Sequence, residues 1–238
     1  MAAPLGYMSL FEIDTNPAGV ASYVRLGDGL TSAAVALNQV VDKKSYLDDD
    51  GGTNTEVTGF DYGIAFSGDH IPTDAAQAFI FGKQLALGAD CHTNFRQTVA
   101  SGAVYTGDCT ITIDTPPGGD ASATLAVGFT INMNGKPVET LPVAATTEAG
   151  VYAEGSAIGT TKFTPTTPAG AGNHLAYRLT TAAVTSKNRE YISNAITYTS
   201  GADIVAAATQ YLSVWELDVY NHVVYFVCSI LTGKVKVS

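Results

Sequence analysis

The chain has 238 residues, of which 46% are hydrophobic and 14% charged, so it is long enough and apolar enough to fold as one large or two smaller domains. Its net charge of −10 arises within residues 1–145, which hold 16 acidic and 6 basic side chains, whereas residues 146–238 hold six of each. This balance argues against binding to nucleic acid or an anionic membrane, and no apolar run is long enough to span a bilayer. The N-terminal residues lack the pattern of a secretory signal.

The odd number of cysteines favours reduced thiols in a protein that folds in a cytoplasm: Cys91, Cys109 and Cys228.

The first predicted element is a long β-hairpin at about 32–68. Its returning strand alternates strictly, with Phe60, Tyr62, Ile64 and Phe66 on one face and small or weakly polar residues on the other. Alternation of period two predicts a strand with one face in a core, so these four residues form the expected core strand. The opposite face has few long charged side chains, which suits close approach of another surface or the wall of a passage.

The hairpin tip, with the sequence YLDDDGG at 46–52, places three carboxylates beside two glycines. An EF-hand register with Gly51 at position six would put Tyr46 at position one and Val57 at position twelve, so this calcium loop is excluded. Nothing nearby would desolvate one of the carboxylates and raise its pKa, which argues against acid–base catalysis. We interpret the tip as a solvated acidic turn, with an irregular calcium site as the alternative.

One helix is predicted at about 73–88, capped by Thr73 or Asp74 and ended by Gly88. The segments 93–99 and 104–113 flank a short turn and predict a second hairpin. The segment TLAVGFTINMNG at 124–135 alternates like the first hairpin. Residues 1–140 are therefore predicted to form a mainly β domain with one helix.

Residues 141–155 are rich in Pro, Ala, Thr and Gly, which is typical of a linker. Residues 156–238 are predicted to form a second β domain, about the size of a small β-sandwich. Four aromatic residues of this domain are candidates either for a ligand groove or for core packing: Tyr191, Tyr198, Tyr211 and Trp215.

Motifs that carry chemistry are absent from the sequence. There is no nucleophile elbow and no phosphate-binding glycine loop, and the histidines lack metal-site spacing, so we expect surface or boundary positions for His70, His92, His174 and His222. The sequence predicts no catalytic residue, no metal site and no cofactor. We therefore expect a structural or binding protein rather than an enzyme.

Several segments, taken in order, resemble the major tail tube proteins of long, non-contractile-tailed phages of the siphovirus type. They are Tyr46-Leu47 before an Asp/Gly-rich tip, TEVTG at 55–59, FSG at 66–68, AQAFIF at 76–81, GGDA at 118–121 and NGKP at 134–137. The resemblance covers residues 5–140, and its specificity lies in the order and spacing of motifs that are individually weak. The DDDGG sequence is more acidic than the tip of that family. Residues 156–238 look like the small Ig-like β modules that are sometimes appended to such proteins.

The resemblance implies a tail-tube-type β-sandwich or barrel with one helix, and a C-terminal β-sandwich on the tube exterior. It implies self-assembly into stacked hexameric rings around a tape measure protein, with tail terminator and initiator proteins as further partners. Double-stranded DNA would pass through the lumen without specific binding during genome ejection, with no membrane partner. The subunit would be assembled in the host cytoplasm and become part of the virion tail.

In such a tube, the hairpin tip and arm would contact the neighbouring subunit or ring, through Tyr46, Leu47, Asp48, Asp49, Asp50, Gly51, Gly52, Thr55 and Glu56. The alternative interpretation is a two-domain β binding module, such as an adhesin or a carbohydrate-binding protein.

Overall fold

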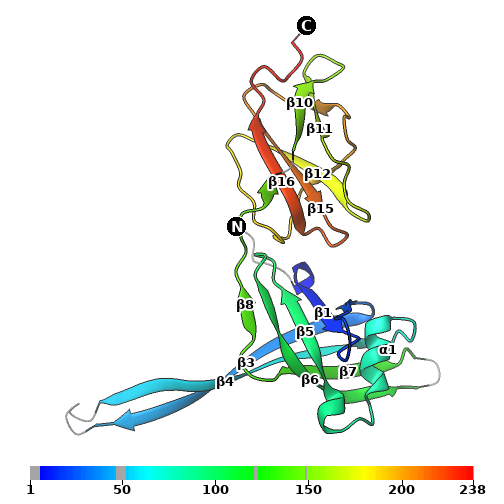
Figure 1. Ribbon diagram of the computed structural model, residues 1–238, viewed down its shortest axis with the longest axis vertical. Coiled ribbons are helices and arrows are strands. Elements are labelled where there is room, and N and C mark those ends of the chain that lie inside the picture. Colours follow the sequence, from blue (N-terminus) through cyan, green and yellow to red (C-terminus); the bar gives the residue numbers. More distant parts are fainter. Residues whose placement is uncertain (1–5, 47–51, 121–122, 148, 238) are drawn as a thin grey trace. The chain divides into compact units, whose positions relative to one another are not determined.

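The computed structural model describes residues 6–46, 52–120, 123–147 and 149–237 (Figure 1). It divides into two compact units. Unit 1 consists of Met1–Gln97 with Val104–Glu139, and unit 2 of Thr98–Ala103 with Thr140–Ser238. Both units consist mainly of β-strands, and the described residues contain one α-helix, which confirms the predicted fold class. Within these residues, no helix has both the length and the apolar character needed to cross a membrane.

Unit 1 is built on an eight-stranded sheet with the order β2-β1-β5-β6-β7-β4-β3, in which β8 pairs with β6. A short 3-10 helix, η1, precedes the first strand. The bounds are η1 Gly6–Met8, β1 Leu10–Asp14, β2 Tyr23–Leu26, β3 Leu30–Ser45, β4 Thr53–Asp69, β5 His92–Thr98, β6 Val104–Gly118, β7 Ala126–Met133 and β8 Val138–Thr140.

The hairpin predicted at about 32–68 corresponds to β3 and β4, which pair from Leu30–Gly68 to Ser45–Thr53. On its other side β4 pairs with β7 only over Gly63–Asp69. The two strands therefore continue beyond the sheet as a ribbon that extends away from the rest of unit 1 (Figure 1). We call this ribbon, residues 37–45 and 53–62, the arm.

The core of unit 1 lies between the concave face of the sheet and the helix α1, Ala75–Gly82. The rings of Phe66 and Phe129 stack with centroids 5.1 Å apart, and Phe81 meets Phe129 edge to face. Ala76 and Ile80 of the helix are fully buried against this cluster. Alternation in β4 and β7 supplies the aromatic and β-branched side chains that fill the space under the helix.

A buried glutamine ties the helix to the root of the hairpin. Asp74 caps the helix by accepting a hydrogen bond from the backbone N–H of Gln77 (2.7 Å). The Gln77 side chain, 1% exposed, donates to the carbonyl oxygens of Asp28 and Asp69 and accepts from the N–H of Ile71. One side chain thus satisfies a backbone group of the turn before β3 and two at the end of β4 and just after it.

The predicted helix at 73–88 is too long, because α1 ends at Gly82. Glycine is the poorest helix former after proline, and the N–H of Lys83 already closes the last turn on Ile80 and Phe81. The following residues form turns, and Gly88–Cys91 is the 3-10 helix η3.

Unit 2 consists of a three-stranded sheet, β10-β11-β14, and a five-stranded sheet, β13-β12-β15-β16-β9. One core cluster centres on Phe163, Leu212 and Val214, and a second, around Trp215, covers the other face of the larger sheet. The bounds are β9 Thr146–Thr147, β10 Gly150–Glu154, β11 Thr160–Pro165, β12 His174–Thr180, β13 Ile196–Tyr198, β14 Ile204–Val205, β15 Tyr211–Leu217 and β16 Val223–Ile230.

The linker predicted at 141–155 is wrong over the two strands that lie within it, β9 and β10. β10 pairs with β11 through five residue pairs, and the Tyr152 ring packs on Phe163 with centroids 4.8 Å apart. An edge strand needs one partner strand and few apolar side chains, so a segment rich in Gly, Ala and Thr can still form one.

Candidate assembly surface

The arm has one apolar and one small or polar face. Cross-strand pairs place Val35 opposite Ile64, Leu37 opposite Tyr62 and Val41 opposite Val57. These residues share a face with Phe60 and Phe66, and we call it the apolar arm face. The other face presents mainly small and polar residues, with Val40 as the exposed apolar exception: Ala34, Ala36, Asn38, Val40, Asp42, Gly59 and Asp61.

A β-bulge at Thr58 keeps the apolar side chains on one face. Val40 is opposite Gly59 and Val41 is opposite Val57, so Thr58 is an extra residue in β4. Its hydroxyl donates to the carbonyl oxygen of Val40 (3.4 Å). If Thr58 were paired as an ordinary strand residue, strict alternation would place Val57 on the face opposite to Phe60.

The apolar arm face continues the buried face of the sheet into solvent. Ile64 and Phe66 are 0% and 3% exposed, whereas Phe60, Leu37 and Val57 are 39%, 52% and 52% exposed. The change occurs where β4 loses β7 as a partner and no second layer covers the strands. The prediction that Phe60 is a core residue is therefore wrong, while Tyr62 is half-buried and donates to Gln97 Oε1 (2.6 Å).

A cleft of about 400 Å³ lies at the root of the hairpin. Phe11, Leu26, Leu30 and Phe66 form its apolar part, and Ala33, the partner of Phe66 across the strands, also lines it. The apolar arm face thus begins in this cleft and runs outward along β3 and β4. Two further apolar side chains, Leu85 and Leu87, are more than 80% exposed after α1.

The convex side of β4, β6 and β7 forms a second, polar surface. Hydrogen bonds connect its side chains: Thr130 donates to Asp114 (2.6 Å), and Asn134 donates to Asp108 (2.9 Å). We call this surface the polar sheet face, and its members include three aspartates and no Lys or Arg: Asp61, Gly63, Ala65, Asp108, Thr110, Thr112, Asp114, Thr130, Asn132 and Asn134.

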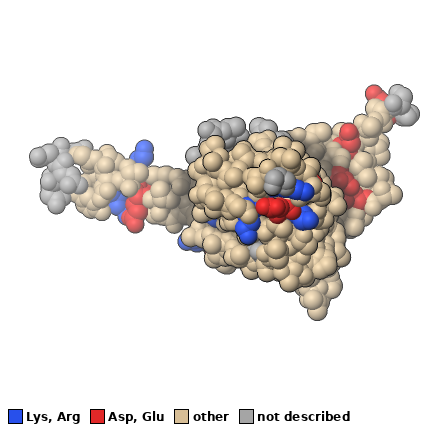
Figure 2. Space-filling model, turned by 90° about the horizontal axis from the view of Figure 1, so that it is seen from above, with Lys and Arg blue, Asp and Glu red and all other residues tan. Residues whose placement is uncertain are grey.

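Charged side chains are sparse on the surface that Figure 2 shows, where most of the atoms belong to uncharged residues. On the arm, Lys44 and Asp42 form an exposed ion pair with an N–O distance of 2.8 Å. Exposed pairs of this kind contribute little to stability. The chemistry of the arm is therefore dominated by its apolar face.

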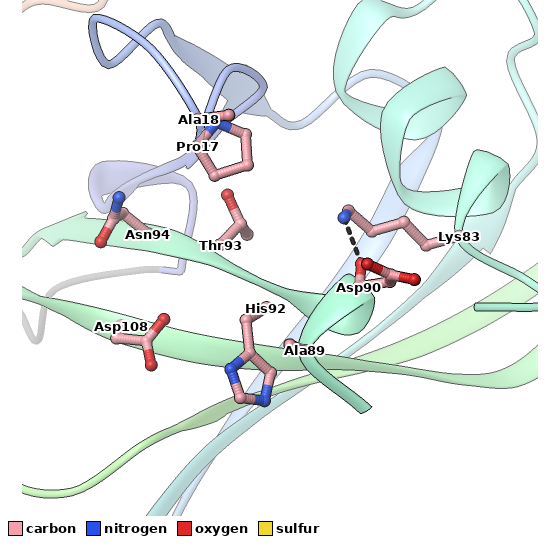
Figure 3. A pocket seen from close by; sticks show the side chains of 9 residues that line it. All are labelled: Pro17, Ala18, Lys83, Ala89, Asp90, His92, Thr93, Asn94 and Asp108. Carbon is pink, nitrogen blue, oxygen red and sulfur yellow. Dashed lines mark hydrogen bonds between the residues drawn. The ribbon is translucent and has the colours of Figure 1, made fainter. Parts of the chain in front are cut away.

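A shallow polar cleft lies between α1, β5 and the 15–22 loop (Figure 3). Lys83 Nζ donates to the carbonyl oxygen of Asp90 (2.5 Å), and His92 is exposed. Asp108, on the same cleft, accepts from Asn134. These side chains make contacts within the chain, and the described residues hold no group of three or more His, Cys, Asp or Glu side chains that could bind a metal.

Asp14 organises the loop above this cleft. It is 1% exposed, and its carboxylate accepts hydrogen bonds from the N–H groups of Asn16 and Ser22 and from the Asn94 amide, at 2.8–3.1 Å. Burial opposes ionisation of this carboxylate, but the three donors outweigh it and lower the pKa of Asp14 below its ordinary value.

The predicted contact residues of the tip are only partly described. Tyr46 is 49% exposed, and Gly52, Thr55 and Glu56 are exposed at the far end of the arm. Leu47, Asp48, Asp49, Asp50 and Gly51 lie outside the described residues. The sequence interpretation missed Val35, Leu37, Val41 and Val57, although their pairing with the alternating strand was the available signal.

Two of the four aromatic residues proposed for a ligand groove in unit 2 serve core packing, while Tyr191 and Tyr211 are partly exposed. Trp215 is fully buried, and Tyr198 is 7% exposed with its hydroxyl donating to the carbonyl oxygen of Phe163 (2.7 Å). His222, expected at the surface or a boundary, is 5% exposed beside Tyr191. All three cysteines are free, and burial raises the pKa of Cys109 to about 12.

Comparisons with known proteins give distant likenesses. Residues 153–231 match the family described as the C-terminal domain of S-layer protein SbsC, and no curated protein matches the chain. Among solved structures, the tail of an empty gene transfer agent particle, refined with C6 symmetry, is 17% identical, with a TM-score of 0.46 over 58% of this chain and 99% of that one. Domains 7, 8 and 9 of SbsC are 20% identical, with a TM-score of 0.38 over 57% of this chain and 38% of that one.

Proposed function

We propose that this chain is the structural subunit of a phage tail tube, which self-assembles into stacked hexameric rings and forms the conduit for genome delivery. The observation that carries the proposal is the apolar arm face, which extends the core of unit 1 into solvent along both strands of the hairpin. The ordered motifs shared with tail tube proteins over residues 5–140 support the same assignment.

A second copy of the chain is the natural cover for this face. Continuous apolar surface on a soluble protein marks an interaction site, and burial releases about 25 cal/mol per Å². β3 is also the last strand of its sheet, with sixteen residues, and long unprotected edge strands pair with other chains unless something covers them. Repeated around a ring, the contact between one arm and the next subunit would join six copies.

The polar sheet face suits the wall of the lumen. Its aspartates, threonines and asparagines hydrogen-bond to one another and offer no cation to phosphate. Because affinity for DNA depends on the number of phosphates that a protein neutralises, such a wall would let a duplex pass without gripping it. The tape measure protein would occupy the same lumen before ejection, and tail initiator and terminator proteins would cap the tube in the virion.

Electron microscopy of the purified full-length chain tests the proposal. We expect rings and tubes with sixfold symmetry as concentration rises, and no retardation of double-stranded DNA in a gel at 150 mM salt. The chain remaining monomeric in sedimentation velocity at every concentration, also with tail initiator proteins added, would contradict the tube. Selective binding on a glycan array together with a monomeric state would instead favour the adhesin alternative.

A further inference from the structure

Unit 2 contains a pocket of about 300 Å³ at the rim of its sandwich, at the lower end of the range for ligand sites. Glu216 of β15 forms part of it, together with Tyr225 of β16, the Thr147 and Thr167 side chains and Pro168. Glu216 and Tyr225 are direct cross-strand partners. They therefore present their side chains to the same face of the sheet.

The Glu216 side chain is almost fully covered by protein, and its two carboxylate oxygens differ in their contacts. The residue is 4% exposed, and its Oε1 accepts hydrogen bonds from the N–H of Gly170 (2.9 Å) and from Asn173 Nδ2 (2.6 Å). Within the described part of the chain, Oε2 accepts no hydrogen bond, and no Lys, Arg or His nitrogen lies within 4.0 Å of the carboxylate. Oε2 is not among the fully buried polar atoms that lack a partner, and the residue lines the pocket, so this oxygen is the one available to a ligand.

Packing alone does not call for an acid at this position. Leu212 and Val214 precede Glu216 on the same face of β15, and both are fully buried in the core between the two sheets. A third apolar residue would continue the pattern but would leave the Gly170 N–H and the Asn173 amide without their acceptor. These two donors use only Oε1, and a neutral amide side chain could serve them equally well, so the charge itself is left to the pocket that Glu216 lines.

A primary ammonium group matches this site. It carries one positive charge and three donors, so it can bind Glu216 Oε2 while the Thr147 and Thr167 hydroxyls accept its remaining hydrogens. An aliphatic stem or sugar ring would lie against Pro168 and the half-exposed Tyr225 ring. A metal ion is a poor match, because the described residues of the lining offer a single carboxylate.

We propose that this pocket binds a primary ammonium group, carried either by a lysine side chain or by an amino sugar. The site lies wholly within unit 2, and the proposal does not depend on the tube function.

Saturation-transfer NMR with the full-length chain tests the site, using paired probes that differ only in charge. Nα-acetyl-lysine amide is compared with its Nε-acetylated form, and glucosamine with N-acetylglucosamine. We expect an affinity in the millimolar range, about 4 kcal/mol, for at least one amine and at least tenfold weaker binding of its acetylated partner. The pair with the larger difference identifies the lysine or the sugar as the source.

Glu216→Gln is the matching variant, because an amide oxygen can still accept from Gly170 and Asn173 while the charge is removed. We expect at least a tenfold loss of amine binding, and no loss for Glu154→Gln, an exposed acid of the same unit. Circular dichroism checks that Glu216→Gln folds. If this variant does not fold, the proposal is tested on the native chain alone, by comparing the binding of each amine with that of its acetylated form. Equal binding of the amines and their acetylated forms, no saturation with any probe, or full binding by folded Glu216→Gln would overturn the proposal.

Discussion

Two strands of this molecule, β3 in unit 1 and β15 in unit 2, differ in whether their apolar side chains are buried within the chain. Both carry Val and Leu side chains, yet β15 is buried from Leu212 to Leu217, while the residues of β3 beyond Leu30 are almost all exposed. β15 lies in the middle of a sheet with apolar clusters on both faces. Unit 2 thus completes its core within one chain, whereas unit 1 leaves part of its apolar surface exposed along the arm.

Charge divides the two units in the same way. Unit 1 holds all of the net charge of −10, because residues 98–103 and 140–145 contain no charged side chain and unit 2 has six acids and six bases. In the proposed tube, acid on the side of unit 1 that faces DNA would keep the polyanion from binding to the wall. The balanced charge of unit 2 would not serve this purpose.

The largest expected effect is the loss of assembly when a charge is placed on the apolar arm face of unit 1. Val57→Asp should abolish rings and tubes in electron micrographs, because it places an unpaired charge in a buried contact. The monomer should keep its unfolding free energy within about 0.5 kcal/mol, since the side chain is exposed in a single chain. Val205→Asp, on an exposed strand of unit 2, is the matched control and should assemble normally. Tubes formed equally well by Val57→Asp would mean that the apolar arm face is not the interface.

The second prediction contrasts the buried and exposed ends of the same sheet face. Phe129→Ala should cost about 3–5 kcal/mol because it opens a cavity beside Phe66 and Phe81, whereas Phe60→Ala should cost under about 1 kcal/mol in the monomer. Urea unfolding followed by far-ultraviolet circular dichroism measures both, with Trp215 fluorescence as the reference signal from unit 2. Similar losses for the two variants would show that Phe60 is covered within the chain.

The third prediction concerns the root of the arm. Gln77→Leu should destabilise unit 1 by roughly 2–3 kcal/mol, because the backbone groups of Asp28, Asp69 and Ile71 lose a buried partner. Gln84→Leu, at an exposed position after the helix, should change stability by less than about 0.5 kcal/mol. Faster amide exchange at Ile71 in Gln77→Leu would locate the loss, and unchanged exchange there would contradict it.

The smallest expected effect is a difference between the two units in how their stability depends on pH. The pKa of Asp14 is lowered in the folded chain, so its stabilising contribution is complete above the ordinary pKa, near pH 4, and is lost as pH falls through the lower folded value. Asp14→Asn should therefore flatten the fall in stability between about pH 5 and pH 3.

Asp203 of unit 2 provides the comparison. Its pKa is lowered, chiefly by the hydrogen bond from the Ser156 N–H, but the carboxylate is exposed, so Asp203→Asn should change the acid dependence less. Thermal unfolding between pH 3 and pH 6 measures both variants. If Asp203→Asn changes the acid dependence of stability more than Asp14→Asn does, the prediction is wrong.

Alternation in the sequence predicted the strand of Ile64 and Phe66 and the face that these residues share. It could not predict that Phe60 is exposed, because periodicity defines a face but not whether another layer covers it. The extent of β7 pairing decides that, and it depends on contacts between Gly63–Asp69 and residues more than fifty positions away.

Other features depended on side chains whose role appears only in three dimensions. Gln77 and Asp14 look like ordinary polar residues, yet Gln77 donates to the backbone of Asp28, 49 residues away, and Asp14 accepts from the side chain of Asn94, 80 residues away. Glu216 interrupts an apolar alternation, which was a visible signal, but its pocket is formed by loops that the sequence does not place. The linker prediction failed at β10 because small residues are compatible with both a linker and an edge strand.

The single extra residue at Thr58 has a consequence for how this protein can change over generations. It shifts the phase of β4 by one, so that the residues on its two sides remain on a common face. A further one-residue insertion between Thr53 and Tyr62 that is not absorbed as a bulge would turn the outer part of the strand over, whereas deletion of Thr58 would remove the bulge and leave the two parts in phase. Length variation in the arm should therefore be accepted either as loss of this one residue or in steps of two residues, matched in β3.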